Sequence, residues 1–132
     1  MSNIMMSRDE SILEEIGSVL GLSLNFDEEG QCSLVFDQDL FVSLSIWKDN
    51  SWFLSGLLLN SLPVEMGESF WRKVMILNCG VARDNAGNIV YSDDDNVLLL
   101  MDTITELSNA HAIISHLERF VNQLEFLIKE LR

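Results

Sequence analysis

Basic residues are scarce in this sequence, which has 8 Lys and Arg against 21 Asp and Glu and a formal net charge of -13 at pH 7. Proteins that bind nucleic acid neutralise phosphates with clustered Lys and Arg, and binding to anionic membranes needs similar clusters. The composition therefore argues against both functions. It favours solubility and a neutral or basic partner.

Cysteine, proline and long apolar runs are also rare. Cys32 and Cys79 are too few for a disulfide framework or a zinc site, and they fit a reducing compartment. No run approaches the roughly 18 apolar residues of a membrane helix. Residues 1–11 lack the basic-then-apolar pattern of a secretory signal, and the single Pro63 separates elements rather than domains. We expect one cytoplasmic domain over residues 1–132, with no membrane insertion.

Hydrophobic residues are nevertheless abundant, at 48% of the 132 residues. A small domain with this composition usually buries the surplus in a dimer interface or against a partner. We therefore expect apolar surface beyond what the core needs.

Four short runs with strand character lie in residues 22–59, separated by polar turns of three or four residues. Three alternate apolar and polar residues, so their apolar side chains share one face of a sheet. Turns this short make neighbouring strands antiparallel. The runs are LSLNF (22–26), QCSLVF (31–36), LFVSLSIW (40–47) and WFLSGLLL (52–59). The last is apolar on both faces, as in a central strand or one at a dimer contact.

Some large side chains fall out of phase with this apolar face. Two interpretations remain open: a helix or a subunit interface covers them, or they form exposed pockets for an extended peptide. They are Val35, Phe41, Trp47 and Phe53.

The four runs of residues 22–59 thus predict a β-meander, and two helices are predicted outside it. The first helix begins at a capping-box pattern at residues 7–10 and ends at Gly21. Its apolar side chains form a stripe along one face, which either packs wholly on the sheet or is partly a docking surface. The middle helix follows Pro63 and weakens at residues 78–80. Val74 and Leu77 fit an ordinary core, whereas Trp71 and Met75 fit a subunit interface.

The last third of the chain predicts a hairpin, at residues 89–91 and 96–101, and a long helix. A second capping-box pattern at residues 103–106 precedes apolar residues spaced by three and four up to Leu131. We expect this helix to cover the sheet, and a free coiled coil is the alternative. Consecutive carboxylates at 93–95 point apart in a tight turn, which favours a solvated hairpin tip over a metal site.

Catalytic patterns find little support. His111 and His116 are five residues apart, so they do not share a helix face as ligands at i and i+4 would. No phosphate-binding glycine loop, nucleophile elbow or zinc-protease motif is present. We expect no enzyme activity, no cofactor and no metal.

The element order and three segments resemble class I type III secretion chaperones, the Tir-chaperone-like family. Those proteins show a glycine after the first helix, a short strand, an acidic turn, and a strand ending in Phe-Asp or Ile-Asp. The similar segments are GLSLNFDEEGQCSLVFDQDLFVSLSI (21–46), LLLNSLP (57–63) with the helix after it, and NIVYSDDDNVLLLMDTI (88–104). The resemblance covers essentially the whole chain.

The resemblance implies an α+β fold, with a twisted antiparallel sheet of meander plus late hairpin and three helices, ordered α-β-β-β-(β)-α-β-β-α. It implies a bacterial cytoplasmic homodimer, without enzyme activity, that binds the N-terminal segment of secreted effectors in extended form. The effectors stay soluble and export-competent until the export machinery takes them. The dimer contact is expected at Phe70, Trp71, Val74 and Met75. Effector binding is expected at Ile12, Leu13, Ile16, Val35, Phe41, Trp47 and Phe53.

Two alternatives remain. A protein of the same fold could instead sequester a transcriptional regulator or another chaperone, and the identity of its partner would show this. A small enzyme or ligand-binding domain would have a closed pocket with converging polar groups, whereas a chaperone would have exposed apolar grooves.

Overall fold

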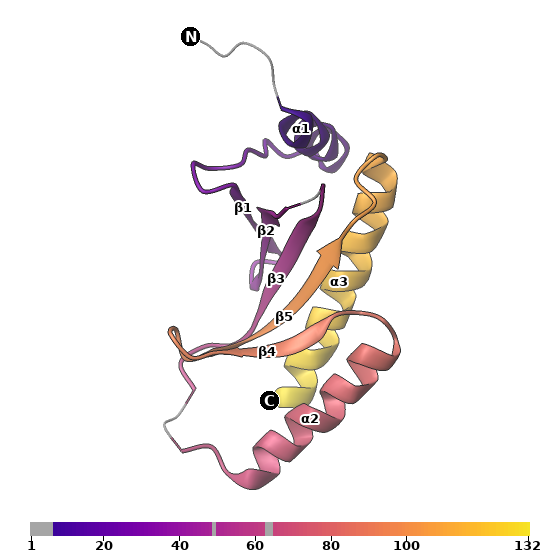
Figure 1. Ribbon diagram of the computed structural model, residues 1–132. Helices are drawn as coiled ribbons and strands as arrows, with labels where there is room; N and C mark the ends of the chain where they lie inside the picture. The colour runs from indigo at the N-terminus through magenta and orange to yellow at the C-terminus, as the bar shows by residue number, and fades with distance from the viewer. Residues whose placement is uncertain (1–6, 49, 63–64) are drawn as a thin grey trace.

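The computed structural model describes residues 7–48, 50–62 and 65–132, so the predicted helix opening at Pro63 lies outside the described residues. The chain forms the expected α+β fold (Figure 1). Its elements are α1 (Arg8–Leu20), β1 (Gln31–Phe36), β2 (Leu40–Ile46), β3 (Trp52–Leu59), α2 (Glu68–Arg83), β4 (Asn88–Ser92), β5 (Val97–Ile104) and α3 (Ala110–Leu131).

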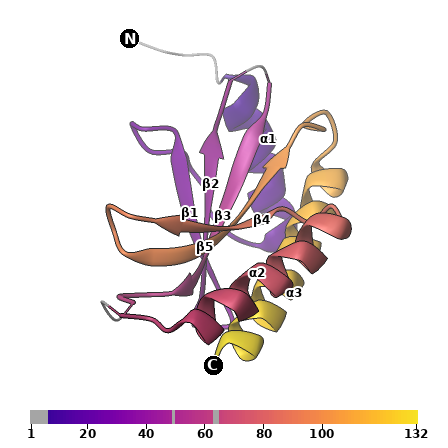
Figure 2. The ribbon, with the colours of Figure 1, turned by 60° about the horizontal axis from the view of Figure 1, so that its bottom comes forward.

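The strands form one antiparallel sheet in the order β1-β2-β3-β5-β4. The predicted meander is β1 to β3, and the predicted hairpin is β4 and β5, which joins the sheet through β5. Figure 2 shows the hairpin crossing the direction of β2 and β3, as expected for strongly twisted strands. The free edges are β1 and β4.

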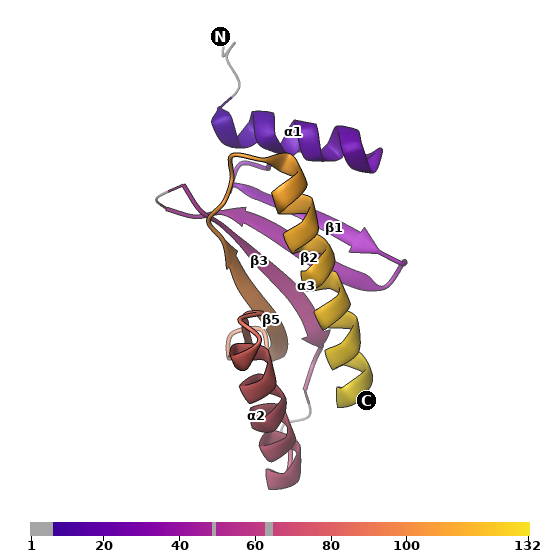
Figure 3. The same cartoon turned by 90° about the vertical axis from the view of Figure 1, so that its right-hand side faces the viewer.

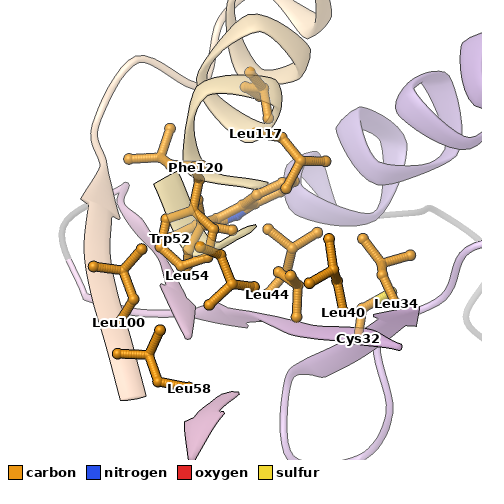
Figure 4. Packing of buried hydrophobic residues seen from close by; sticks show 14 of the residues in the cluster. Cys32, Leu34, Leu40, Leu44, Trp52, Leu54, Leu58, Leu100, Leu117 and Phe120 are labelled. Atoms are coloured by element: carbon orange, nitrogen blue, oxygen red, sulfur yellow. The ribbon is translucent and has the colours of Figure 1, made fainter. Parts of the chain in front are cut away.

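Helix α3 covers one face of the sheet, and α1 crosses near its N-terminal end (Figures 1 and 3). Leucines of the meander point towards Leu117 and Phe120 of α3 (Figure 4). Gly56 of β3 lies directly beneath α3, because a Cβ atom there would be 2.8 Å from a methyl group of Leu124. The prediction that the long helix covers the sheet is confirmed.

Trp52 of β3 connects the sheet to α1. Its side chain is fully buried, and its indole N–H donates a hydrogen bond to Asp9 Oδ1 of α1 at 2.8 Å. The ring of Phe26 packs against it edge to face, with centroids 5.3 Å apart. The capping box of α1 forms as predicted, with Ser7 and Glu10 exchanging two hydrogen bonds of 3.1 Å.

The first predicted strand, residues 22–26, is not a strand. The Leu22 N–H donates to the carbonyl of Gly17 at 2.8 Å, which closes the end of α1. The Asp27 carboxylate then accepts from the N–H groups of Glu29 and Gln31, both at 2.9 Å, and turns the chain into β1. Residues 22–26 are therefore a connection without strand pairing, although they share the alternation of the strands that follow.

The second predicted capping box, at residues 103–106, is also wrong. Ile104 pairs with Trp52, so β5 continues through the first half of that pattern. Helix α3 begins at Ala110, with Asn109 as its N-cap. Helix α2 also runs past residues 78–80, to Arg83. The side chain of Asn78 accepts a hydrogen bond from the Ile89 N–H at 2.6 Å, which joins α2 to β4.

Candidate partner-binding surfaces

The sheet face opposite α3, here called the outer face, has an apolar row that crosses the sheet. Side chains alternate along each strand, so those next to the buried leucines point outward. Val35 pairs with Phe41, and Leu99 pairs with both Leu57 and Val90. The outer row is Val35, Phe41, Leu57, Leu99 and Val90.

A shallow hollow of about 240 Å³ lies along this row. Its apolar wall includes Val35 and Phe41, which remain 55% and 50% exposed. Its polar wall is a ladder of Ser33, Ser43 and Ser55 on three adjacent strands. The hollow thus offers apolar contact beside small hydroxyl groups.

A second aromatic area lies at the other end of the meander. Trp47 stacks on Phe53 with ring centroids 5.2 Å apart and an interplanar angle of 5°. Trp47 is 53% exposed, and Phe53 is half-buried. As predicted from their phase, Val35, Phe41 and Phe53 lie on the face away from the core. Their role in effector binding stays a prediction.

The structure places the predicted binding residues of α1 differently. Leu13 and Ile16 are 1% and 0% exposed and form part of the core, while Ile12 is half-buried. Leu13 and Ile16 lie at the centre of the apolar stripe of α1, where α3 and the core residues of the sheet cover them. This folded monomer therefore offers neither Leu13 nor Ile16 to a partner, which corrects the expectation that they line an open groove.

A second hollow, of about 280 Å³, lies between the C-terminal end of α1, the end of β1 and α3. Phe36 reaches it from β1, and Ile114 and Val121 reach it from α3. The sequence analysis expected this helix to cover the sheet and did not single out these two residues. Ile113, Phe120 and Leu127 fill the core, so the apolar residues of α3 form a stripe wider than the core requires. That width is the signal that could have identified Ile114 and Val121. This α1–α3 groove adjoins the free edge of β1.

Helix α2 packs chiefly against β4 (Figure 1). It exposes large apolar side chains to solvent. Met75 and Ile76 are 68% and 66% exposed. Trp71 packs edge to face on Phe70, with centroids 5.1 Å apart, and both are half-buried. Of the predicted interface residues, Val74 is only 5% exposed and faces the core. The sequence analysis did not predict Ile76 as an interface residue. Its position off the core stripe of α2 is the signal that could have identified it.

A polar hollow of about 320 Å³ lies between the end of α2, β5 and α3. His116 Nε2 is 2.7 Å from Asp102 Oδ2, and this pair joins α3 to β5. No Ser, Thr, Cys or Tyr is among the described residues that line the hollow. Among the described residues, no group of three His, Cys, Asp or Glu side chains could hold a metal ion.

Comparisons with known proteins agree with this geometry. Residues 11–127 match the Tir chaperone protein (CesT) family. A chain of the ExsC–ExsE complex is 22% identical, with coverage of 98% of this chain and 97% of that chain and a TM-score of 0.79. The HopA1–SchA chaperone–effector complex gives 13% identity, coverage of 96% and 99%, and a TM-score of 0.77.

A more distant similarity is to the Yersinia pestis type III secretion chaperone SycH in complex with a stable fragment of YscM2. It is 18% identical, with coverage of 89% of this chain and 98% of that chain and a TM-score of 0.63. These structures share the fold described above. In the described part of the chain, no helix is long and apolar enough to span a membrane.

Proposed function

Because this chain belongs to the Tir chaperone protein (CesT) family, we propose that it is a bacterial cytoplasmic chaperone for type III secretion effectors. As a homodimer, it binds the N-terminal segment of one or more effectors and keeps them soluble and competent for export. The observation that carries the proposal is exposed apolar surface on both sides of a free strand edge, at the outer row and the α1–α3 groove.

The edge strand β1 supports binding of an extended segment. In an antiparallel pair, alternate residues of a strand direct their N–H and C=O groups towards the partner strand, so the others of β1 point to the free edge. Gln31 already bonds Asp27 through both its N–H and its C=O, so the part of β1 that follows it is open to a new strand. Side chains of an added strand alternate between the two faces. One set would therefore enter the α1–α3 groove beside Phe36, and the other would reach the outer face beside Val35.

Apolar burial supplies the affinity in this proposal. Covering a half-exposed side chain such as Val35 or Phe41 contributes on the order of 1 kcal/mol, about half the value for full burial. A disordered segment loses conformational entropy when it binds, so several such contacts are needed together. Two apolar hollows on opposite faces of the sheet, with the strand edge of β1 between them, fit a long segment better than a small molecule.

The test uses the effector that co-purifies with the protein from its native host. We expect the Val35→Ser/Phe41→Ser variant to bind the N-terminal segment of this effector at least about tenfold more weakly in calorimetry, from the loss of two apolar contacts. Phe126→Ser is the matched control, because Phe126 of α3 is 52% exposed and lies outside both hollows. Equal affinity of the two variants would contradict binding at the outer face.

We propose that α2 forms the dimer contact, through Met75 and Ile76 together with Phe70 and Trp71. The exposure of the first two supports this, because aromatic and methionine side chains are typical of interface centres. Light scattering should give a dimer mass for the wild type and for Phe126→Glu, and a monomer mass for Met75→Glu/Ile76→Glu. A monomeric wild type at micromolar concentration would reject the proposal.

A further inference from the structure

Acidic turns border the outer row at both of its ends. At the β1 end, Asp37 follows Val35 by two residues, and Asp39 completes the turn into β2. At the β4 end, residues 93–95 are three consecutive aspartates, three residues beyond Val90. All five carboxylates are exposed. The two turns lie at the same end of the strands, because β1 and β4 both run towards them.

No basic side chain of the sheet balances these carboxylates. Residues 9–47 and 84–118 contain no Lys or Arg, and these ranges include β1, β2, β4 and β5. Within the described ranges, Arg72 forms an ion pair with Glu68 on α2 and His116 contacts Asp102, and neither pair involves the two turns. The outer row is therefore apolar along its length and negative at both ends.

The dimensions of the row limit what can lie on it. It crosses five strands, and adjacent strands are about 4.8 Å apart, so the row is roughly 19 Å long. An extended chain advances about 3.3 Å per residue, so roughly six residues span this length. A second copy of this chain is a poor occupant, because it would bring its own two acidic turns against the same face.

We propose that the effector segment seated on the outer row has an apolar stretch of about six residues bracketed by Lys or Arg on both sides. The inference rests on the proposed function and adds the chemistry of the cargo to it. The apolar stretch covers the row, while the flanking cations meet Asp37 and Asp39 at one end and the 93–95 turn at the other. The charges of the flanking residues then distinguish this segment from other apolar segments, which would otherwise bind with similar affinity.

The test measures binding of three synthetic peptides to the full-length protein by fluorescence anisotropy. The peptides have about 14 residues and share one central stretch of about six apolar residues, and they differ only in flanks of Lys, Gln or Glu. We expect the Lys-flanked peptide to bind at least about tenfold more tightly than the Glu-flanked one at low salt, with the Gln-flanked peptide between them. Added salt should reduce the difference.

Two variants in which acidic side chains are neutralised show where the preference for Lys-flanked peptides arises. Asp93→Asn/Asp94→Asn/Asp95→Asn should lose most of the preference for Lys at that end. The control, Glu106→Gln/Glu125→Gln/Glu130→Gln, makes the same change in net charge at exposed positions outside both hollows and should keep the preference. An equal loss in both variants would mean that net charge alone attracts the peptide, which would overturn the inference.

The remaining outcomes separate the inference from the proposed function. If Lys-flanked and Glu-flanked peptides bind equally and both lose affinity in Val35→Ser/Phe41→Ser, the outer face binds cargo but does not select basic flanks. If the Lys-flanked peptide binds that variant as tightly as the wild type, the apolar row is not its site and the inference is wrong. If no peptide binds while the native effector segment does, the proposed cargo chemistry is rejected and the chaperone function stands.

Discussion

Replacing Gly56 by Ala tests the packing that positions the outer face. The new Cβ atom would lie 2.8 and 2.9 Å from the two methyl groups of Leu124 and 3.1 Å from the ring of Phe120. Leu124 is 0% and Phe120 is 3% exposed, so neither side chain can move into solvent. Helix α3 must therefore move away from β3, or core side chains must leave their preferred rotamers.

The expected cost follows from two opposing terms. Overpacking a well-filled core costs about 1–3 kcal/mol, whereas replacing Gly by Ala reduces the entropy of the unfolded chain and returns about 0.4–1 kcal/mol. We expect a net loss of about 1–2 kcal/mol in the free energy of unfolding. For a domain of this size, that corresponds to a fall of roughly 3–10 °C in Tm.

Urea denaturation at one fixed protein concentration measures this loss, because dimer formation would make stability depend on concentration. Ser55→Ala is the control: it changes the neighbouring residue on the opposite face and should shift stability by less than about 0.5 kcal/mol. The Gly56→Ala/Leu124→Ala double variant should lose less stability than the sum of the losses in the two single variants, because truncating Leu124 removes the clash. A Gly56→Ala protein as stable as the wild type would refute the close contact between α3 and β3.

Two further predictions concern α1 and the cysteines. Asp9→Ala leaves the buried Trp52 N–H without its partner at 2.8 Å, so urea denaturation should show a loss of about 1–3 kcal/mol, whereas Asp9→Asn keeps an acceptor and should cost less. Burial raises the pKa of the Cys32 thiol, so in a Cys79→Ser variant this thiol should not react with a disulfide reagent until urea unfolds the protein. Rapid reaction in the folded state would show that the sheet opens near Cys32.

Local patterns were sufficient for much of the fold. The turn chemistry around β1, β2 and β3 and the cap at Ser7 depend on residues close in sequence, so they could be predicted. Residues 22–26 could not be separated from the strands by alternation, because an extended connection also alternates when one side lies on a core. Leu24 and Phe26 are indeed half-buried without belonging to the sheet.

The binding surfaces depended more on contacts between distant segments. The phase of Val35 and Phe41 showed that they point away from the core, since only the alternation of one strand is needed for that. The burial of Leu13 and Ile16 depends on where α3 crosses α1, which no local pattern specifies. The α1–α3 groove forms from three elements far apart in sequence, so its residues could be placed only in the folded chain.

Hydrogen exchange of the full chain, with and without the N-terminal segment of its native effector, tests the central claim most directly. If the segment adds to the edge of β1 and covers the outer row, backbone N–H groups within residues 31–36 should exchange more slowly in the complex. The N–H groups of α3 near the His116–Asp102 pair should exchange at unchanged rates. Protection near that pair, with none in β1, would contradict the account.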